Sequence, residues 1–414
     1  MTSVPNTQKS LLILSQVYPP DPASVGQHIA DVATEMARRG HRVRVVTANR
    51  GYDDPHIVYP SRDTIQGVEI RRLSLSSYGK KRFVLRMFGT LVFMLESFFA
   101  VLFTPHVDGI LFSTSPPLVG FAVALAAMLR RIPIAYWVMD LNPDQLIILK
   151  KIRSGSWAAR LLEAVNRFSL RRSALVVALD RFMAERLRAL APLEAKLVTI
   201  PPWPHDDHAK PAGLAANPFR AKHNLDGAFV IMYSGNHSSS NPLTTLLMAA
   251  IDLKDDSNLR FLFVGGGLGK KEVEAAIRDH SLSNVVSLPY QPLADLGYSL
   301  SAADIHVVTL GSEMVGIIHP CKIYGAMAVA RPILFFGPKP SHISDLLDSH
   351  SIGWQVSHGD VAGAVGIIRR LRQLPPGTLR EMGALAYSVV KNGINREKLC
   401  GEFCNTLEKY LKFL

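Results

Sequence analysis

Short apolar runs alternate along the chain with longer segments whose apolar residues recur every three or four positions. Short apolar runs indicate buried strands, and the wider spacing indicates helices packed over them. The first set is an apolar run at 9–17, a loop at 18–28, a helix ending near Arg39 and a strand at 41–48. This order of strand, helix and strand is typical of a parallel sheet covered by helices.

The alternation continues to about residue 204 and then begins again. Further strands are predicted at 67–75, 109–112, 132–140 and 174–180, and then at 229–235, 259–267, 284–292, 305–310, 332–337 and 353–356. Residues 205–218 between the two halves are rich in Pro, Ala and charge, as a linker is. We therefore predict an α/β protein of two Rossmann-like domains, 1–204 and 219–392, which face each other across a cleft. A final helix, 393–414, returns to the first domain.

The most apolar segment is Phe83–Phe103, which is long enough to cross a bilayer. Arg86 and Glu96 lie inside it, and a charge within a single span is costly. Basic residues precede it at Lys80, Lys81 and Arg82. We expect a helix packed on the first domain with one apolar face at the surface of an anionic membrane. The alternative is a helix buried completely in the core.

The composition of the 414 residues favours anionic partners. The formal net charge is +12, and the mean hydropathy is +0.15. Nucleotides and anionic lipids suit such a chain, whereas aromatic residues are not interleaved with basic ones as nucleic-acid binding requires. Three cysteines without a C-x-x-C spacing, and an amino terminus without an apolar signal segment, favour a cytoplasmic protein, either free or peripheral on the inner membrane face.

The candidate chemistry is concentrated after the strand at 305–310. Glu313, Gly316, His319 and Lys322 follow within twelve residues, and a helix of small residues is predicted at 323–330. A strand, a glycine-bearing loop and a helix start form an anion site, to which a lysine adds a full charge. We interpret this stretch as a binding site for the diphosphate of a nucleotide sugar. An ordinary strand–helix connection with a solvated lysine is the alternative.

Other candidate residues follow other strands, where ligands of parallel sheets bind. They are Gly26, His28 and Asp140 in the first domain, and Gly235, Asn236, His237, Leu288, Pro289 and Tyr290 in the second. His28 and His319 are candidates for contacts with phosphate or with hydroxyl groups. The alternatives are a surface histidine at a helix start for His28, a loop cap for Asp140 and a solvated acid for Glu313.

No metal or cofactor is expected. Asp206, Asp207 and His208 resemble a metal cluster, but they lie in the predicted linker without a second set of ligands. Asp53-Asp54 and Asp255-Asp256 fall in polar, turn-like stretches, and the G-x-S-x-G motif of serine nucleophiles is absent.

The order of the motifs resembles glycosyltransferase family 4 over nearly the whole chain. These motifs are YPPD, GQH, GHRVRVVT, YWVMDLNP, IPPW, YSGN, FVGGG, LPYQP and E-x-x-G-x-x-x-P-x-K-x-Y-x-x-M-A. The chain is most similar to the branch that builds bacterial cell-surface polysaccharides. The resemblance implies the GT-B fold and a metal-independent, retaining transfer of a hexosyl or N-acetylhexosaminyl group. The donor would be a nucleotide sugar, and the acceptor a glycan or a polyprenyl-linked glycan.

The resemblance also implies roles for individual residues. Gly26 would approach the donor phosphate, and Asp140 would lie near the acceptor or the transferred sugar. Leu288 to Tyr290 would hold the base through backbone contacts. Lys322 would neutralise phosphate charge, and backbone N–H groups would contact sugar and phosphate at Gly316, Ile317 and Ile318.

The chain departs from the family signature at two places. The family has two glutamates eight positions apart, where this chain has Ile317 and Gly325. The basic pair that commonly follows the YSGN-type strand is replaced by the polar run 236–240. Two other functions therefore stay open, a nucleotide-sugar epimerase and a catalytically inactive nucleotide-sugar-binding protein.

Overall fold

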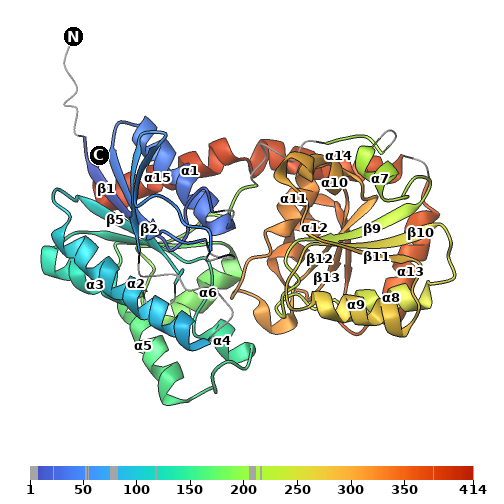
Figure 1. Ribbon diagram of the computed structural model, residues 1–414, viewed down its shortest axis with the longest axis horizontal. Coiled ribbons are helices and arrows are strands. Elements are labelled where there is room, and N and C mark those ends of the chain that lie inside the picture. Colours follow the sequence, from blue (N-terminus) through green and yellow to red (C-terminus); the bar gives the residue numbers. More distant parts are fainter. Residues whose placement is uncertain are drawn as a thin grey trace, which may run out of the picture. The chain divides into compact units, whose positions relative to one another are not determined.

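The computed structural model describes residues 8–21, 23–51, 54, 56–74, 83–116, 119–204, 211–214, 217–375 and 377–413. The cluster Asp206, Asp207 and His208 therefore lies outside the described residues. Contacts divide the chain into two compact units. The first unit comprises Met1–Pro202, Gly316–Ile318 and Glu397–Leu414, and the second comprises Trp203–Val315 and His319–Arg396. Each unit contains a sheet covered by helices (Figure 1).

The sheet of the first unit has the strand order β3-β4-β2-β1-β5-β6-β7-β8. The strands are β1 (Ser10–Leu14), β2 (Arg42–Ala48), β3 (Arg62–Ile65), β4 (Val68–Leu73), β5 (Gly109–Ser113), β6 (Ile134–Trp137), β7 (Leu175–Ala178) and β8 (Leu197–Thr199). All neighbours are parallel except β3 and β4. In the central strand, Leu12 pairs with Arg44 on one side and Ile110 on the other. All five residues of β1 are buried, which explains its continuous apolar run.

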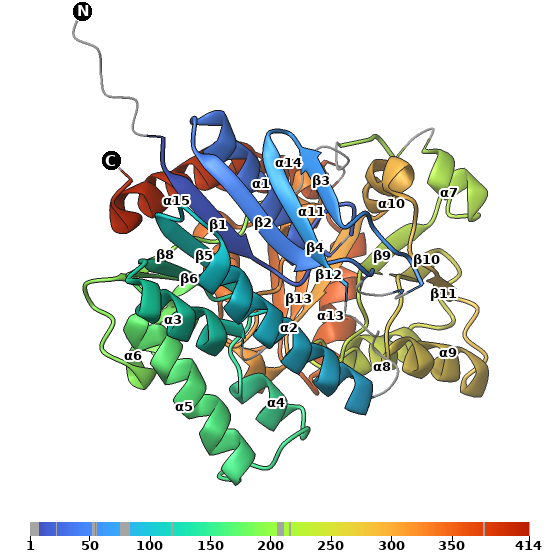
Figure 2. The ribbon, with the colours of Figure 1, turned by 60° about the vertical axis from the view of Figure 1, so that its left-hand side comes forward.

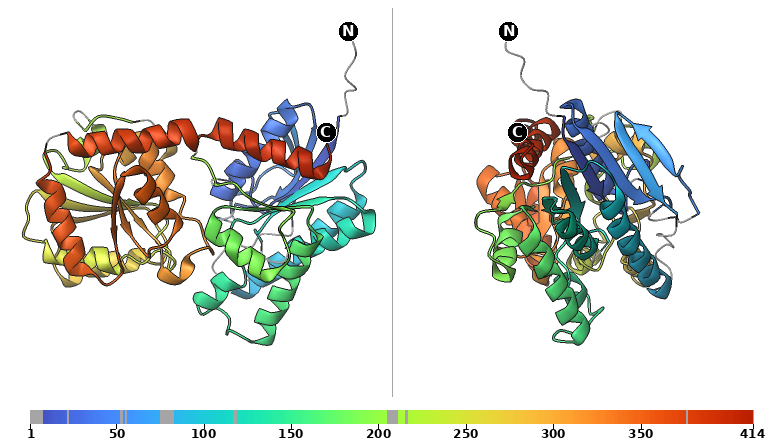
Figure 3. Two further views of the ribbon diagram at one scale, coloured as in Figure 1. Left: turned by 180° about the vertical axis from the view of Figure 1, so that it is seen from behind. Right: turned by 90° about the vertical axis from the view of Figure 1, so that its left-hand side faces the viewer.

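Helices cover both faces of this sheet. On one face, α1 (Ser24–Arg38) lies beside α15 (Arg396–Leu411) (Figure 3). The ring centroid of Trp137 in β6 is 4.1 Å from that of Phe403 in α15. On the other face lie α2 (Phe83–Phe103), α3 (Val119–Arg130) and α5 (Trp157–Arg172) (Figure 2). Tyr136 points to that face, where its hydroxyl donates to Asn166 Oδ1 at 3.2 Å. The shorter helices are α4 (Asp144–Ile148) and α6 (Arg181–Leu190).

The second unit has a fully parallel sheet in the order β11-β10-β9-β12-β13-β14. The strands are β9 (Phe229–Ser234), β10 (Leu259–Val264), β11 (Val285–Leu288), β12 (Ile305–Thr309), β13 (Ile333–Phe336) and β14 (Gly353–Val356). Its helices are α7 (Pro218–Lys222), α8 (Thr244–Asp252), α9 (Lys270–Asp279), α10 (Leu296–Ser301), α11 (Lys322–Ala328), α12 (His342–His350), α13 (Val361–Arg372) and α14 (Thr378–Gly393). Short 3-10 helices, η1 (Leu293–Asp295) and η2 (Ser312–Met314), occur in two loops.

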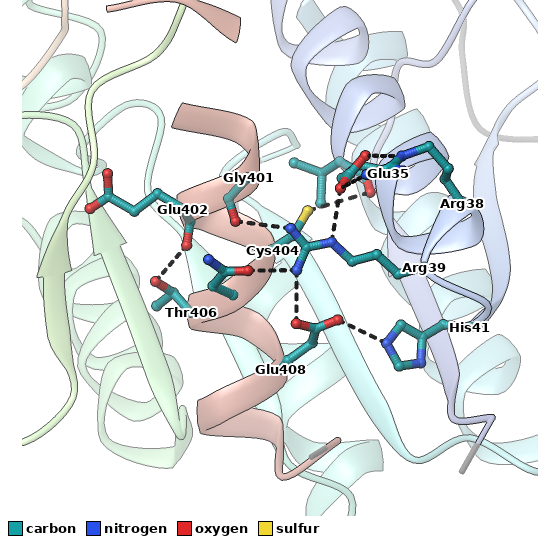
Figure 4. Close-up of polar contacts among 11 residues, drawn as sticks. Glu35, Arg38, Arg39, His41, Gly401, Glu402, Cys404, Thr406 and Glu408 are labelled. Carbon is teal, nitrogen blue, oxygen red and sulfur yellow. Dashed lines mark hydrogen bonds and ion pairs between the residues drawn. The ribbon is translucent and has the colours of Figure 1, made fainter. Parts of the chain in front are cut away.

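Ion pairs attach the C-terminal helix to the first unit (Figure 4). The carboxylate of Glu408 accepts from Arg39 Nη1 at 2.8 Å and contacts His41 Nε2 at 3.0 Å. Arg39 also donates to the carbonyl of Gly401 and to Glu35. The helix therefore combines an apolar face against the sheet with charged contacts to the end of α1. This arrangement confirms the predicted return of the last helix to the first domain.

Several predicted boundaries are wrong. Helix α1 begins at Ser24, so Gly26 and His28 lie in the helix rather than in a loop. The basic segment 149–172 also suggests one continuous helix, but Gly155 has a φ of +71° and α5 begins only at Trp157. The antiparallel strand β3 and the helix α12 were missed. Strand β3 is short and mostly polar. Helix α12 is also short, although its Ile343, Leu346 and Leu347 recur at helical spacing.

Candidate functional site

Glycines form the ends of two neighbouring strands in the second unit. Gly235 follows β9, and Gly265 and Gly267 follow β10, with φ values of +127°, +133° and +121°. A Cβ atom on Gly265 would lie 2.1 Å from the Gly235 carbonyl oxygen. The two loops are joined by the His237 N–H, which donates to the Gly266 carbonyl at 2.7 Å. Only glycine fits at these three positions. The two loops therefore present backbone groups without side chains, which we call the glycine surface.

Lys322 extends across this glycine surface. Its Nζ donates to the Tyr233 hydroxyl and, at 2.8 Å, to the Asn236 carbonyl. A Cβ atom on Gly235 would lie 2.6 Å from Lys322 Cε, so the lysine passes directly over the glycine. When its amide is oriented to satisfy both neighbours, Asn241 accepts from the same Nζ at 3.3 Å. Burial lowers the pKa of Lys322 to about 7. An anion bound here would favour the charged form and raise that pKa.

Two further basic groups lie near these strand ends. Lys270 Nζ, at the start of α9, donates to the carbonyls of Gly265 at 3.0 Å and Leu288 at 2.9 Å. Burial lowers the pKa of the His237 imidazole, and the charges of Lys322 and Lys270 lower it further. Lys270 is absent from the residues predicted above, although the run GGGLGK places a lysine just after a glycine turn. The strand ends thus gather three groups that can carry positive charge.

The predicted base-contact segment follows the edge strand of the same sheet. Leu288 ends β11, and its carbonyl accepts from the Gly265 N–H at 3.0 Å as well as from Lys270. Tyr290 is 61% exposed, and its ring lies 3.1 Å from where a Cβ atom on Gly266 would be. An exposed aromatic ring therefore lies beside the glycine turn, where it is available to a planar ligand.

The loop before Lys322 differs in detail from its prediction. The helix predicted at 323–330 is α11, which has only seven residues and begins at Lys322. Glu313 is exposed in η2. His319 is buried, with Nε2 at 2.8 Å from the Tyr324 hydroxyl. That hydroxyl is also 3.1 Å from Nε2 of His342.

Residues 316–318 of this loop belong by their contacts to the first unit. Gly316 has a φ of +72°, which favours glycine, and the Ile317 side chain is completely buried. At Ile317, where the resemblance places a glutamate, this chain has a buried apolar side chain.

In the first unit, the predicted site residue Asp140 follows β6, and His28 lies within α1. The N–H of Asp140 donates to Thr114 Oγ1 at 3.1 Å, and burial raises the pKa of its carboxyl to about 6. His28 is buried, with Nδ1 at 2.9 Å from the Ser24 carbonyl oxygen and its ring edge toward Trp137. The interpretation of His28 as a surface histidine is therefore wrong. Gly26 packs on its own loop, because a Cβ atom there would lie 3.1 Å from the Tyr18 nitrogen.

Comparisons with known proteins agree with this architecture. Residues 24–203 match the family model of the glycosyl transferase 4-like domain. The chain is 25% identical to WbjE of Pseudomonas aeruginosa, named as a glycosyltransferase, over 69% of this chain and 70% of that protein. It is 22% identical to WcaI of Escherichia coli, named as a colanic acid biosynthesis glycosyl transferase, over 96% of this chain and 99% of that one.

Solved structures show the same fold. A sucrose-phosphate synthase from Thermosynechococcus elongatus has a TM-score of 0.75 and 16% identity, over 98% of this chain and 100% of that one. HepE of Anabaena in complex with UDP-glucose has a TM-score of 0.69 and 15% identity, over 97% and 99%. The chain therefore has the GT-B fold. The domain match and the two named relatives make it a glycosyltransferase. The match of residues 24–203 to the glycosyl transferase 4-like domain confirms the resemblance to glycosyltransferase family 4 that the motifs predict. Among the described residues, no helix has both the length and the apolar content needed to cross a bilayer.

Proposed function

We propose that the protein transfers a hexosyl or N-acetylhexosaminyl group from a nucleotide sugar to a glycan or polyprenyl-linked acceptor in surface-polysaccharide synthesis. The observation that carries this proposal is Lys322, a partly buried lysine held over a glycine surface at the carboxyl ends of β9 and β10. The names of WbjE and WcaI support the reaction class, and the UDP-glucose complex of HepE supports the donor class.

In this proposal the donor diphosphate lies on the strand-end loops of the second unit. Lys322 and Lys270 stabilise the charge that grows on the leaving phosphate as the glycosidic bond breaks. The acceptor hydroxyl attacks from the face that the nucleotide leaves, its oxygen forms the new bond to the anomeric carbon, and the leaving phosphate takes its proton. The configuration is retained, and no protein nucleophile or metal is needed.

We assign the base to the segment Leu288–Tyr290 and the sugar and phosphate contacts to the loop 316–319. Asn236 and His237 take the place of the basic pair of the family. In the first unit, Asp140 and His28 are assigned to the acceptor hydroxyl or the transferred sugar, and Gly26 to the donor phosphate.

A panel of nucleotide sugars tests the donor site through thermal unfolding. A bound donor at about one hundred times its Kd would stabilise the protein by about 2.7 kcal/mol. We expect one donor to raise Tm in the wild type and to lose that effect in Lys322→Ala. Lys339→Ala is the matched control, because Lys339 is an exposed lysine of the same unit. If no nucleotide sugar shifts Tm, the donor assignment is wrong.

An inactive binding protein is the second candidate, because Ile317 and Gly325 stand where the family has glutamates. Release of free nucleotide decides between the two functions. A transferase releases nucleotide when a glycan or polyprenyl-linked acceptor is added, whereas an inactive protein binds the donor without turnover on any acceptor.

A further inference from the structure

Helix α2 has one apolar face in the core and a second apolar face exposed. Its buried residues include Phe93, Ala100 and Val101. Five large apolar side chains are between 48% and 72% exposed, and they are Phe88, Leu91, Leu95, Phe99 and Phe103. Steps of three or four residues place these five on one stripe of the helix. The alternative of a completely buried core helix is therefore wrong for this part of α2.

The end of α2 is hydrogen-bonded to a neighbouring helix. Arg130 Nη1 donates to the carbonyls of Val101 at 2.7 Å and Thr104 at 2.6 Å, which ties the end of α3 to the end of α2 (Figure 2). Leu129, next to that arginine, is 62% exposed. Large contiguous apolar patches are uncommon on soluble monomers and mark interaction sites.

The positive charge of the protein lies in the same half of the chain. Residues 1–202 contain 26 Lys and Arg against 15 Asp and Glu, a net charge of +11, whereas residues 203–414 contain 20 against 19. The sequence places Lys80, Lys81 and Arg82 immediately before α2. A partner that covers the stripe must therefore be neutral or negatively charged.

A groove beside the stripe combines apolar and cationic walls. It is an open cavity of about 710 Å³. Phe99 and Phe103 line it on one side, and on the other lie three arginines of the strands, Arg44, Arg62 and Arg71. The two acids of its lining are already ion-paired with further arginines, Asp63 with Arg72 and Glu69 with Arg42. The groove therefore keeps an excess of positive charge next to exposed aromatic rings.

We propose that this surface, the stripe of α2 with Leu129 and the adjoining arginine groove, docks on an anionic phospholipid bilayer. The apolar side chains enter the interfacial layer, and the arginines contact lipid phosphates. A second copy of the chain would also bury the stripe, but it would bring together two surfaces of the same positive charge. The bilayer is therefore the occupant that charge complementarity favours.

Vesicle flotation of the full-length protein tests the proposal. The vesicles contain phosphatidylcholine alone or mixed with phosphatidylglycerol. We expect the wild type to float with the anionic vesicles, to float less with the neutral ones, and to be released as salt rises. The double variant Phe99→Ser/Phe103→Ser should partition at least about tenfold less. Met248→Ser/Leu385→Ser removes two exposed apolar side chains from the second unit and should partition like the wild type.

Three outcomes would overturn the proposal. The wild type could fail to bind anionic vesicles, the two double variants could bind equally, or the wild type could dimerise through the stripe without binding lipid. If Phe99→Ser/Phe103→Ser does not fold, Arg62→Gln/Arg71→Gln tests the charged wall, and unchanged flotation contradicts the proposal. Flotation requires no sugar donor, so a failed membrane proposal is distinguishable from a failed transferase assignment.

Discussion

The two units share a doubly wound architecture but use their basic residues differently. In the second unit, Lys322, Lys270 and His237 gather at the strand ends, although residues 203–414 are nearly neutral in sum. The first unit carries a net charge of +11 over residues 1–202, and its exposed apolar helix lies in that half. A few basic groups at strand ends suit a small anion, whereas a broad positive surface suits an extended partner.

The largest effect should come from the strand ends of the second unit. Removing the charge in Lys322→Ala should lower kcat/KM about 100- to 1000-fold, as the loss of one oxyanion donor does in other enzymes. The fold should persist, because the lysine contributes no apolar core packing. Steady-state kinetics with the identified donor, together with a thermal melt, measure both. An unchanged rate would remove Lys322 from the reaction, and Lys339→Ala should keep wild-type kinetics.

The next largest effect is a loss of unfolding free energy in the first unit, where the C-terminal helix packs on the N-terminal part of the chain. Glu408→Ala leaves Arg39 and His41 without their shared carboxylate partner, and the side chain of Glu408 is only 10% exposed. Breaking such a mostly buried pair should cost about 3 kcal/mol of unfolding free energy. Denaturant unfolding measures it. Glu402→Ala on the same helix is the control, since Glu402 is exposed, and equal stability of the two variants would contradict the prediction.

A smaller loss of kcat/KM is expected on replacing Asp140. This variant should show whether Asp140 contacts the acceptor or the donor. If Asp140 accepts a hydrogen bond from the acceptor or the transferred sugar, Asp140→Asn loses a charged hydrogen bond worth about 1.5–3 kcal/mol, roughly 10- to 100-fold in kcat/KM. The donor-induced rise in Tm should stay. Loss of that rise would place Asp140 in donor binding instead. Because burial raises its pKa to about 6, wild-type activity should also fall as the pH drops below 6.

The sequence predicted the fold class well because buried parallel strands are short apolar runs that leave a clear pattern. It missed β3, which is short and mostly polar, and α12, although Ile343, Leu346 and Leu347 recur there at helical spacing. Strand β3 reads RDTI and pairs with β4 in an antiparallel register. Helix α12 begins at a capping box formed by Ser341 and Ser344. The second position of such a box is usually Glu or Gln, so two serines are a weak sequence signal for a helix start.

The site was predicted less completely, because the order of the motifs indicates which residues belong to the site but not which side chains contact one another. Lys322 lies at the strand ends, yet its partners Tyr233 and Asn236 come from a strand some ninety residues earlier. Lys270 was missed since only the structure shows that its Nζ reaches the carbonyl of Leu288. His28 lies edge-on to Trp137, whose ring also contacts Phe403 of α15 from the far end of the chain, a neighbourhood that local sequence does not reveal.

The smallest predicted effect is a pH dependence of donor binding at the strand ends of the second unit. Burial lowers the pKa of Lys322 to about 7, so the lysine of the free protein loses its proton as the pH rises above 7. The donor phosphate prefers the protonated form, and Kd should therefore rise about tenfold per pH unit above 7, with one proton taken up on binding. Titration calorimetry in buffers of different ionisation enthalpy counts that proton.

Lys322→Arg sharpens this prediction, because arginine stays charged throughout the range and should abolish the slope. The pH dependence of the free energy of unfolding provides an independent test. The unfolded lysine has a pKa of 10.5, so between about pH 7 and 10.5 the unfolded state binds more protons than the folded state. The free energy of unfolding of the donor-free protein should therefore gain from Lys322 as the pH rises through that window, whereas donor affinity falls. A wild type and a Lys322→Arg variant with the same pH profiles would show that Lys322 is not the group that titrates.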